Sequence, residues 1–350
     1  MSKIRIMHLL QSDRFSGAEN VVCQIIKMFE NDEKLEMAYC SRDGQIRNSL
    51  EEKNIEFYPI DDLNVKEVKR VINEYNPNII HAHDMRASVI AAVASKGAIK
   101  IISHIHNSDF QSRKLSIKSL LYYIFSWKYN KIIWVSNSCY NGYYFHEKLQ
   151  AKSIVMYNTV NKEDILFKAK KDYDGPNYDV IYIGRLAEPK NPQRLMYIVK
   201  MLTELYPSVS VAVVGQGNLE KETKDLANKL NLNDNVTFLG FMSNPLPVLE
   251  HSKVLVLTSD REGTPMVALE AMALNKPIVS TPTDGLCDLI TIGKTGYLDN
   301  NNEFFAKHLI ELLTNDKKYH LFEQEVEKSF SEFNNENKYY RKLKVLYEES

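Results

Sequence analysis

The chain has 350 residues, 44% of them hydrophobic, which is longer than one hydrophobic core usually organises and favours two domains. Lysine and arginine number 44 against 45 acidic residues, so the overall charge gives no electrostatic argument for a nucleic-acid partner. The cysteines, Cys23, Cys40, Cys139 and Cys287, lack zinc-ribbon spacing and indicate reduced thiols in a cytoplasmic protein.

Short runs rich in Ile and Val alternate with helical stretches through the first half of the chain: "KIRIMHLL", "LEMAYCS", "NIIHAHD", "KIISHIH", "KIIWVSN" and "SIVMYN". Because these runs are continuously apolar, they indicate parallel strands covered by helices on both faces. The first run turns polar too soon for a signal peptide, and no stretch reaches the roughly 18 to 20 apolar residues that cross a bilayer. We therefore expect a cytoplasmic protein that contacts membranes only at their surface.

The stretch Arg113 to Lys131, "RKLSIKSLLYYIFSWKYNK", is basic and aromatic and contains no acidic residue. Basic amphipathic helices with Trp and Tyr can lie on anionic membranes, in this case at the inner face of the plasma membrane. A helix that covers the sheet, with its lysines in solvent, explains the pattern equally well.

A charged segment with Gly-Pro, Lys168 to Asp179, is the predicted linker. Strand–helix alternation resumes after it with "VIYIGR", "VSVAVVGQG", "NVTFLGF", "VLVLTSD" and "PIVSTP". The sequence thus predicts an α/β protein with two doubly wound Rossmann-like domains, 1–167 and 180–330, facing across a cleft with ligand sites at the carboxyl ends of the strands. Residues 331–350 predict a helix that is able to pack back on the first domain.

The segment "EGTPMVALEAMALNKP" predicts a helix from about 265 to 275. Thr264 is a good N-cap and Pro265 a good first helical residue. Free amides from Gly263 onward and the helix dipole favour a phosphate at this end, and Gly263 lets a ligand approach the backbone.

Two carboxylates flank this anion site. Glu262 lies in the turn before the helix, where it can hold sugar hydroxyls. Glu270 lies roughly 7 to 8 Å along the helix axis, a reach that suits a ribose diol beside a diphosphate. A buried carboxylate without a partner costs several kcal/mol or takes up a proton, so Glu270 needs something to bind. The alternative is a solvated Glu262 and a Glu270 paired with a lysine or a backbone amide.

Two further segments add candidate ligand contacts. In "YIGRLAEPKNPQRL", Gly184 ends a strand, and Arg185 and Lys190 follow in the loop, where two cations suit a diphosphate. A solvated basic loop is the alternative. The motif "VVGQGN", with Gly215 and Gly217, marks another strand end where backbone can approach a ligand, although G-x-G alone is weak evidence.

These segments resemble the retaining glycosyltransferases of family four, which have the GT-B fold. The C-terminal motifs that carry the resemblance are "GRLAEPKNP", "VVGQGN", "LGFM", "SDREGTPMVALEAMALNKPIVSTPTDG" and "GKTGYL". In the N-terminal half, "FSGAENVV" is similar to the glycine loop of the family, "IIHAHD" to a recurring strand end, and "IISHIHN" to the His-Asn motif of exopolysaccharide and capsule members. Coverage is about 4–298. The chain departs from the family at "NTVN", where Asn-Gly-Val-Asp is common, and no role is assigned there.

The resemblance implies a metal-independent hexosyltransferase of surface polysaccharide biosynthesis that needs no cofactor. Its donor would be a nucleotide diphosphate sugar, with UDP favoured and GDP open, and its acceptor a glycan or a lipid-linked saccharide. In this family the acceptor hydroxyl attacks from the face that the diphosphate leaves, and the diphosphate takes the proton.

The resemblance also implies site residues. Arg185 and Lys190 would bind the diphosphate, and Glu262 would contact the transferred sugar. His106 would lie against that sugar, and Glu270 would take the ribose hydroxyls. The remaining substrate-binding positions are Gly17, which approaches the phosphates or the acceptor, and Gly184, Gly215, Gly217, Gly263, Thr264, Pro265 and Met266.

Other functions use the same features. The pairs His81 with His83 and His104 with His106 each point to one strand face and, with Asp84 nearby, suggest a zinc hydrolase, which leaves the cations and the other carboxylates without a role. A nucleotide-sugar 2-epimerase is also a two-domain protein with an interdomain nucleotide. A non-catalytic sensor would bind the nucleotide sugar without turning it over.

Overall fold

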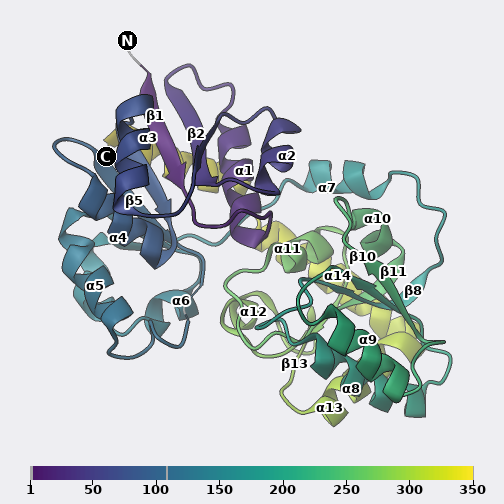
Figure 1. The fold of residues 1–350 in the computed structure, drawn as a ribbon. Coiled ribbons are helices and arrows are strands. Elements are labelled where there is room, and N and C mark those ends of the chain that lie inside the picture. Colours follow the sequence, from purple (N-terminus) through teal and green to yellow (C-terminus); the bar gives the residue numbers. More distant parts are fainter. Residues whose placement is uncertain (1–2, 108, 350) are drawn as a thin grey trace. The chain divides into compact units, whose positions relative to one another are not determined.

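The structure is a computed structural model that describes residues 3–107 and 109–349. It forms two compact units, shown in Figure 1. Unit 1 contains the chain up to Asn158 and the segment from Glu336, and unit 2 is Thr159–Asn335. Among the described helices, none has the length and apolar content needed to cross a bilayer.

Unit 1 is built on a sheet of seven parallel strands in the order β3-β2-β1-β4-β5-β6-β7. The order reverses between β1 and β4, which is where doubly wound sheets leave a ligand crevice. The strands are β1 (Ile4–Leu9), β2 (Leu35–Arg42), β3 (Phe57–Ile60), β4 (Ile79–His83), β5 (Lys100–Ile105), β6 (Lys131–Trp134) and β7 (Ser153–Val155).

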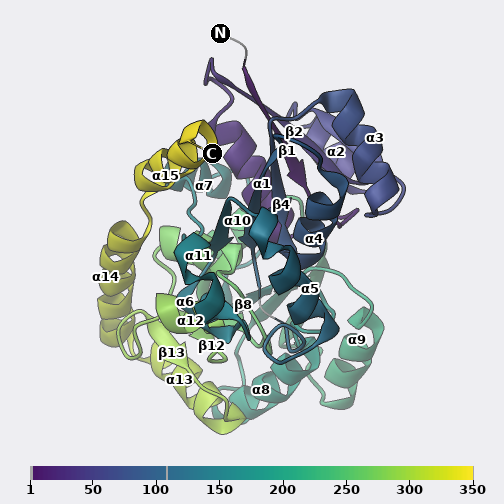
Figure 2. The same ribbon diagram turned by 90° about the vertical axis from the view of Figure 1, so that its left-hand side faces the viewer.

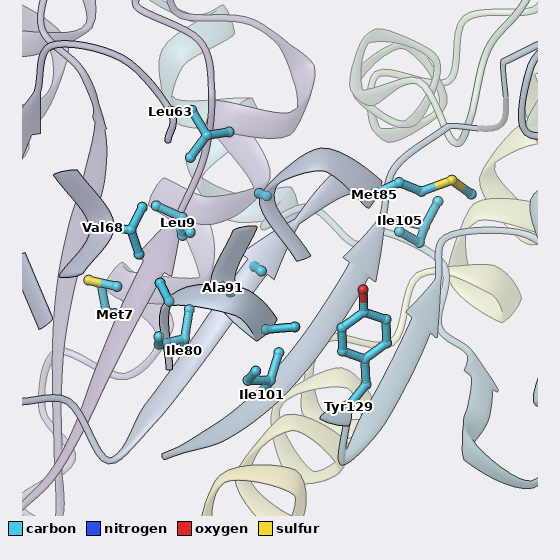
Figure 3. Close-up of a cluster of buried hydrophobic side chains, with 14 of the residues drawn as sticks. Met7, Leu9, Leu63, Val68, Ile80, Met85, Ala91, Ile101, Ile105 and Tyr129 are labelled. Atoms are coloured by element: carbon cyan, nitrogen blue, oxygen red, sulfur yellow. The ribbon is translucent and has the colours of Figure 1, made fainter. Parts of the chain in front are cut away.

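Helices cover both faces of this sheet, because successive strand residues point to opposite faces and both sets are apolar. Ala38 and Cys40 of β2 join the larger core cluster, whereas Tyr39 between them joins a second cluster on the other face. Figure 3 shows part of the larger cluster, with Met7 and Ile80 among its side chains. The helices are α1 (Gly17–Met28), α2 (Ile46–Glu51), α3 (Val65–Tyr75), α4 (Asp84–Ala94), α5 (Ile117–Phe125), α6 (Asn137–Gly142) and α15 (Glu336–Glu349), with 3₁₀ turns at Ser126–Lys128 and His146–Lys152.

The helix α15 completes unit 1 and lies beside the end of α1, as Figure 2 shows. The ring of Tyr340 stacks on Phe29 with 4.6 Å between centroids. Lys344 pairs with Asp32 at 2.7 Å, and the buried Tyr347 hydroxyl is hydrogen-bonded to Nδ1 of His81 at 2.8 Å. The contacts of α15 therefore reach the centre of the unit 1 sheet.

Unit 2 has a sheet of six parallel strands in the order β10-β9-β8-β11-β12-β13, which reverses between β8 and β11. Its strands are β8 (Tyr178–Ile183), β9 (Val211–Val214), β10 (Val236–Gly240), β11 (Ser252–Leu257), β12 (Ile278–Ser280) and β13 (Gly296–Leu298). Its helices are α7 (Lys162–Ala169), α8 (Pro192–Leu205), α9 (Glu220–Lys229), α10 (Leu246–Glu250), α11 (Met266–Ala273), α12 (Asp284–Leu289), α13 (Asn302–Thr314) and α14 (Asp316–Phe333). The predicted α/β class with two doubly wound sheets is confirmed.

The boundary between the units lies earlier than the 168–179 linker expected from composition. Helix α7 belongs to unit 2 because it buries Ile165 and Ala169, and the carbonyl of Lys168 accepts a hydrogen bond from Asn244 Nδ2 at 3.0 Å. The chain leaves and re-enters unit 1 at neighbouring points. Val160 N donates to Asn334 Oδ1 at 2.9 Å, and Asn334 Nδ2 donates to Val160 O at 2.8 Å.

The contacts of Tyr347 predict a specific stability loss. Tyr347→Phe leaves the buried Nδ1 of His81 without a partner and should lower the free energy of unfolding of unit 1 by about 1 to 3 kcal/mol. Both tryptophans of the chain, Trp127 and Trp134, lie in unit 1, so urea unfolding followed by tryptophan fluorescence measures this unit. The control is Val345→Ala on the same helix, 47% exposed, which should stay within about 0.5 kcal/mol. An unchanged midpoint for Tyr347→Phe would contradict the prediction.

Candidate active site

In unit 2 the two segments predicted to bind the diphosphate meet where the strand order reverses. The loop after β8 is held to the turn after β11 by Thr258, whose hydroxyl donates to the carbonyls of Lys190 at 3.1 Å and Asn191 at 3.0 Å. Asp260 N donates to Pro189 O at 2.8 Å. The cationic loop and the start of α11 thus lie at one edge of the sheet, at the carboxyl ends of β8 and β11.

Lys190 and Glu262 form an ion pair across this edge, with side chains 21% and 9% exposed. The hydroxyl of Ser259 also donates to Glu262 Oε1, at 2.6 Å. Glu262 is therefore neither solvated nor isolated, contrary to the alternative interpretation of the sequence. An anion that binds at Lys190 must share or displace this carboxylate.

Arg185 differs from Lys190 in being exposed, so its guanidinium is accessible from solvent. The backbone beneath it is fixed. The buried Tyr182 hydroxyl donates to Arg185 O at 3.3 Å, and Leu186 N donates to Gln216 O at 3.0 Å. Asn191 caps the next helix by accepting a hydrogen bond from Arg194 N, and Pro192 opens α8.

The glycines of the β9 loop make a close backbone approach, but to another loop of the protein. A Cβ at Gly215, whose φ is +136°, would lie 2.0 Å from Gly184 O, and one at Gly217 would lie 2.2 Å from Leu186 O. Both positions therefore require glycine so that the β8 and β9 loops can pack together. The expectation of direct ligand approach at Gly215 and Gly217 gains no support from this packing.

The start of α11 lies one residue later than predicted. The first helical residue is Met266 and Pro265 takes the N-cap position, so the assignment of Thr264 as N-cap is wrong by one residue. A residue that sequence reasoning missed is Gly285. A Cβ there would lie 1.4 Å from Gly263 O, so glycine is needed for the turn before α11 to pack on the start of α12.

Glu270 lies in α11 without a protein partner. Its carboxylate makes no hydrogen bond or ion pair with any residue in the described ranges, and the ammonium of Lys168, whose charge acts on it, pairs with Asp164 at 2.6 Å. Burial raises the pKa of Glu270 to about 7, and the charge of Lys168 opposes that rise. The side chain keeps partial access to solvent, so a ligand can reach it.

In unit 1 the strand ends carry a cluster of five buried histidines: His8, His81, His83, His104 and His106. Their rings stack and form two hydrogen-bonded series. His8 Nδ1 lies 3.1 Å from His83 Nε2, and His83 Nδ1 lies 2.8 Å from His106 Nε2. His104 Nδ1 lies 3.2 Å from His81 Nε2. The pairs predicted from His-x-His spacing thus join one cluster, and His8, which the sequence did not single out, completes it.

Burial keeps these histidines neutral. Desolvation lowers the pKa of His8 and His106 to about 3 and holds the pKa values of the others well below the ordinary value. Neutral imidazoles are good metal ligands. Two groups of three, sharing His83, have ring nitrogens within 4.8 Å of one another. Most of these nitrogens already bond to each other; among the described residues, Nε2 of His8 and of His104 are buried ring atoms without a partner.

A cavity of about 290 Å³ lies beside this cluster. Asp84 at its wall has a φ of +69°, unusual for a residue other than glycine, and its Oδ1 accepts a hydrogen bond from His106 N at 3.0 Å. Burial raises the pKa of Asp84 to about 6. Gly17 directly precedes Ala18 of the cavity lining. A Cβ at Gly17 would meet no described atom within 4 Å apart from its chain neighbours and its own helix backbone, so the space beside it is open. The cavity is lined by Leu10, Gln11, Ser12, Ala18, Glu19, Arg42, His83, Asp84, Arg86 and Ala87.

Unit 2 therefore has the features of a nucleotide-binding α/β domain. Cations, the start of a helix and an unpaired carboxylate gather at the reversal point of a doubly wound sheet, where such folds bind phosphates and ribose. Unit 1 adds a separate polar cavity at the equivalent point of its own sheet.

The chain belongs to glycosyltransferase family four. Residues 16–164 match the family described as Glycosyltransferase Family 4, and residues 163–329 match Glycosyl transferases group 1. The two matches together span most of both units.

Individual relatives agree with this assignment. An uncharacterized glycosyltransferase of Methanocaldococcus jannaschii is 30% identical over 256 residues, which are 71% of this chain and 69% of the relative. The capsular polysaccharide biosynthesis glycosyltransferase CapH of Staphylococcus aureus is 24% identical over 79% of this chain and 81% of its own. The crystal structure of Anabaena HepE with UDP-glucose has a TM-score of 0.84 and 20% identity, covering 99% of this chain and 100% of HepE, so the fold is GT-B. The named relatives give no support to the hydrolase or epimerase alternatives.

The neutral histidine cluster predicts an acid-sensitive unit 1. Because the folded pKa values lie below the unfolded value of about 6.5, stability is complete above that pH. As the pH drops below this value, the free energy of unfolding decreases by up to about 1.4 kcal/mol per histidine per pH unit. Urea unfolding by tryptophan fluorescence at pH 8, 6.5 and 5.5 measures the slope. His320→Gln, at a side chain 71% exposed, is the control and should leave the slope unchanged. Equal stability at pH 6.5 and 5.5 would refute the prediction.

Glu270 predicts an opposite pH dependence in unit 2. Its folded pKa of about 7 lies above the ordinary 4.5, so ionisation destabilises the fold as pH rises through this interval. Glu270→Gln should therefore raise the calorimetric melting temperature of unit 2 at pH 8, with little effect at pH 5. Glu303→Gln, at an exposed position in the first turn of α13, is the matched control. An unchanged melting temperature of Glu270→Gln at pH 8 would show that the ionised carboxylate does not destabilise unit 2.

Proposed function

We propose that the protein is a retaining, metal-independent glycosyltransferase. It transfers a hexose from a UDP-sugar to a glycan or lipid-linked acceptor in surface polysaccharide biosynthesis, at the cytoplasmic face of the membrane. The observation that carries the proposal is the hydrogen-bonded junction of the β8 and β11 loops, which gathers Arg185, Lys190 and the first amides of α11 at one sheet edge.

The donor assignment rests on the chemistry of this edge. Two cations and a helix N-terminus suit a diphosphate, and the unpaired carboxylate of Glu270 in the same helix suits the ribose hydroxyls. HepE, which has the same fold, was crystallised with UDP-glucose, and this supports UDP as the nucleotide. CapH supports a role in polysaccharide assembly.

The proposed mechanism follows from charge development. As the bond from the anomeric carbon to the diphosphate breaks, negative charge grows on the departing phosphate, and Arg185, Lys190 and the α11 amides stabilise it without reorganising. The acceptor hydroxyl forms the new bond on the same face and gives its proton to the diphosphate oxygen. Glu262, already held by Lys190 and Ser259, is placed to bind the transferred sugar.

The acceptor side is proposed for unit 1. Its cavity is polar, with the guanidinium-bearing Arg42 and Arg86 and the carboxyl-bearing Glu19 and Asp84 in its lining, and suits a polyhydroxylated ligand. His106 is kept neutral and is fixed by Asp84 and His83, so it can exchange hydrogen bonds with a sugar without carrying charge.

A panel of nucleotide sugars tests the proposal through binding, slow hydrolysis and product analysis. We expect one UDP-sugar to bind and to be hydrolysed slowly to UDP and free sugar. Epimerised nucleotide sugar formed without an acceptor would identify a 2-epimerase, and tight binding without any turnover would identify a sensor. Hydrolysis that depends on a stoichiometric metal would identify a metal-dependent hydrolase.

Arg185→Ala should lower turnover of the preferred donor by about two decades or more, because it removes one fixed charge from the leaving group. Since the side chain is exposed, the melting temperature should not change. Arg341→Ala on α15 is the control and should keep wild-type rates. Wild-type turnover in Arg185→Ala would remove this residue from the mechanism.

A further inference from the structure

Helix α5 and the 3₁₀ turn that follows it present their apolar side to solvent. Ser119, Tyr122 and Ser126 face inward and are buried, which reverses the usual pattern of a surface helix. The outward side chains, with their exposed fractions, are Phe110 67%, Leu115 62%, Ile117 79%, Leu120 42%, Leu121 41%, Ile124 49% and Trp127 71%. We call these seven residues the α5 surface.

Buried hydrogen bonds hold the helix in this orientation. The Tyr122 hydroxyl lies 2.7 Å from Ser103 Oγ, and Tyr143 donates to the Ser119 carbonyl at 2.7 Å. Ser116 caps the helix by accepting from Ser119 N. Turning the apolar side inward would break these bonds, so they fix which side of the helix is exposed.

Cations surround the α5 surface. The stretch 113–131 has five basic residues and no acidic one. Lys114 lies 4.0 Å from the ring centre of Phe110 and Lys128 lies 5.5 Å from that of Trp127, so each end of the aliphatic stripe carries an aromatic–ammonium pair. Lys118 is paired with Asp109, and the Lys128 ammonium donates to the Ala92 carbonyl at 2.6 Å.

We propose that the α5 surface docks on an anionic lipid bilayer. Single exposed apolar residues are normal, but a contiguous stripe of this kind marks an interaction site. Aliphatic side chains at helical spacing would enter the interface, aromatic rings would lie at headgroup level, and the lysines would meet lipid phosphates. A second copy of the chain fits less well, because pairing two such surfaces brings like charges together. The surface lies within unit 1 and does not depend on the proposed transfer reaction.

The full-length protein and vesicles test the proposal. Trp127 is 71% exposed and Trp134 is fully buried, so a spectral change on adding lipid reports on the α5 surface. With phosphatidylglycerol vesicles at low salt we expect co-sedimentation, a blue shift of Trp127 and quenching by brominated lipid. Binding should weaken with added salt and on pure phosphatidylcholine.

A triple variant, Ile117→Ser with Leu121→Ser and Ile124→Ser, should lower vesicle affinity by about tenfold or more while leaving the melting temperature unchanged, because these side chains are already exposed. The matched control, Phe167→Ser with Phe304→Ser and Leu321→Ser, removes three equally exposed apolar side chains of unit 2 and should bind like wild type. The proposal is overturned by no binding to anionic vesicles at low salt, by equal binding of the triple variant, or by self-association in sedimentation equilibrium that the triple variant abolishes.

Discussion

The hydrogen bonds from Thr258 and Asp260 to the loop after β8 are the constraint on which the unit 2 site depends. Parallel strands place their carboxyl ends at one edge, but the loops that follow are free to diverge. A single buried hydroxyl that bonds to two consecutive carbonyls removes that freedom. Glycines at 215, 217 and 285 remove the side chains that would keep the neighbouring loops apart. The cations therefore stand on fixed backbone, which the proposed electrostatic stabilisation of a leaving group requires.

The two carboxylates of this edge are held in different ways. Glu262 accepts from both Lys190 and Ser259 and forms part of a network, whereas Glu270 stands in an apolar helix and has a raised pKa. If an incoming anion binds Lys190, Glu262 still keeps its hydrogen bond from Ser259. An unpartnered carboxylate gains most from a ligand that donates hydrogen bonds. Under the proposed function, a ligand bound at Glu270 would recover the free energy that unit 2 loses there.

Much of the fold followed from the sequence because parallel strands covered on both faces leave a clear apolar pattern, and because motifs at strand ends share an edge. The ion pair of Lys190 with Glu262 could not be predicted, because no sequence pattern indicates a contact between residues 72 positions apart. His8 was missed because one histidine in an apolar strand has no pattern. Asp84 was noticed only as a neighbour of the histidines, since its positive φ cannot be read from residue type. Which side of α5 faces outward could not be predicted from the sequence, because it depends on the hydrogen-bond partners of Ser119 and Tyr122.

The contacts of α15 have a consequence for synthesis on the ribosome. Unit 1 is discontinuous, and its β4 histidine finds its tyrosine partner only in the segment that begins at Glu336. In a nascent chain, unit 1 therefore lacks helix α15 while the whole of unit 2 is translated. The contacts of α15 with Phe29, Asp32 and His81 can form only after residues 336–349 have been made, so the last segment translated completes the first unit.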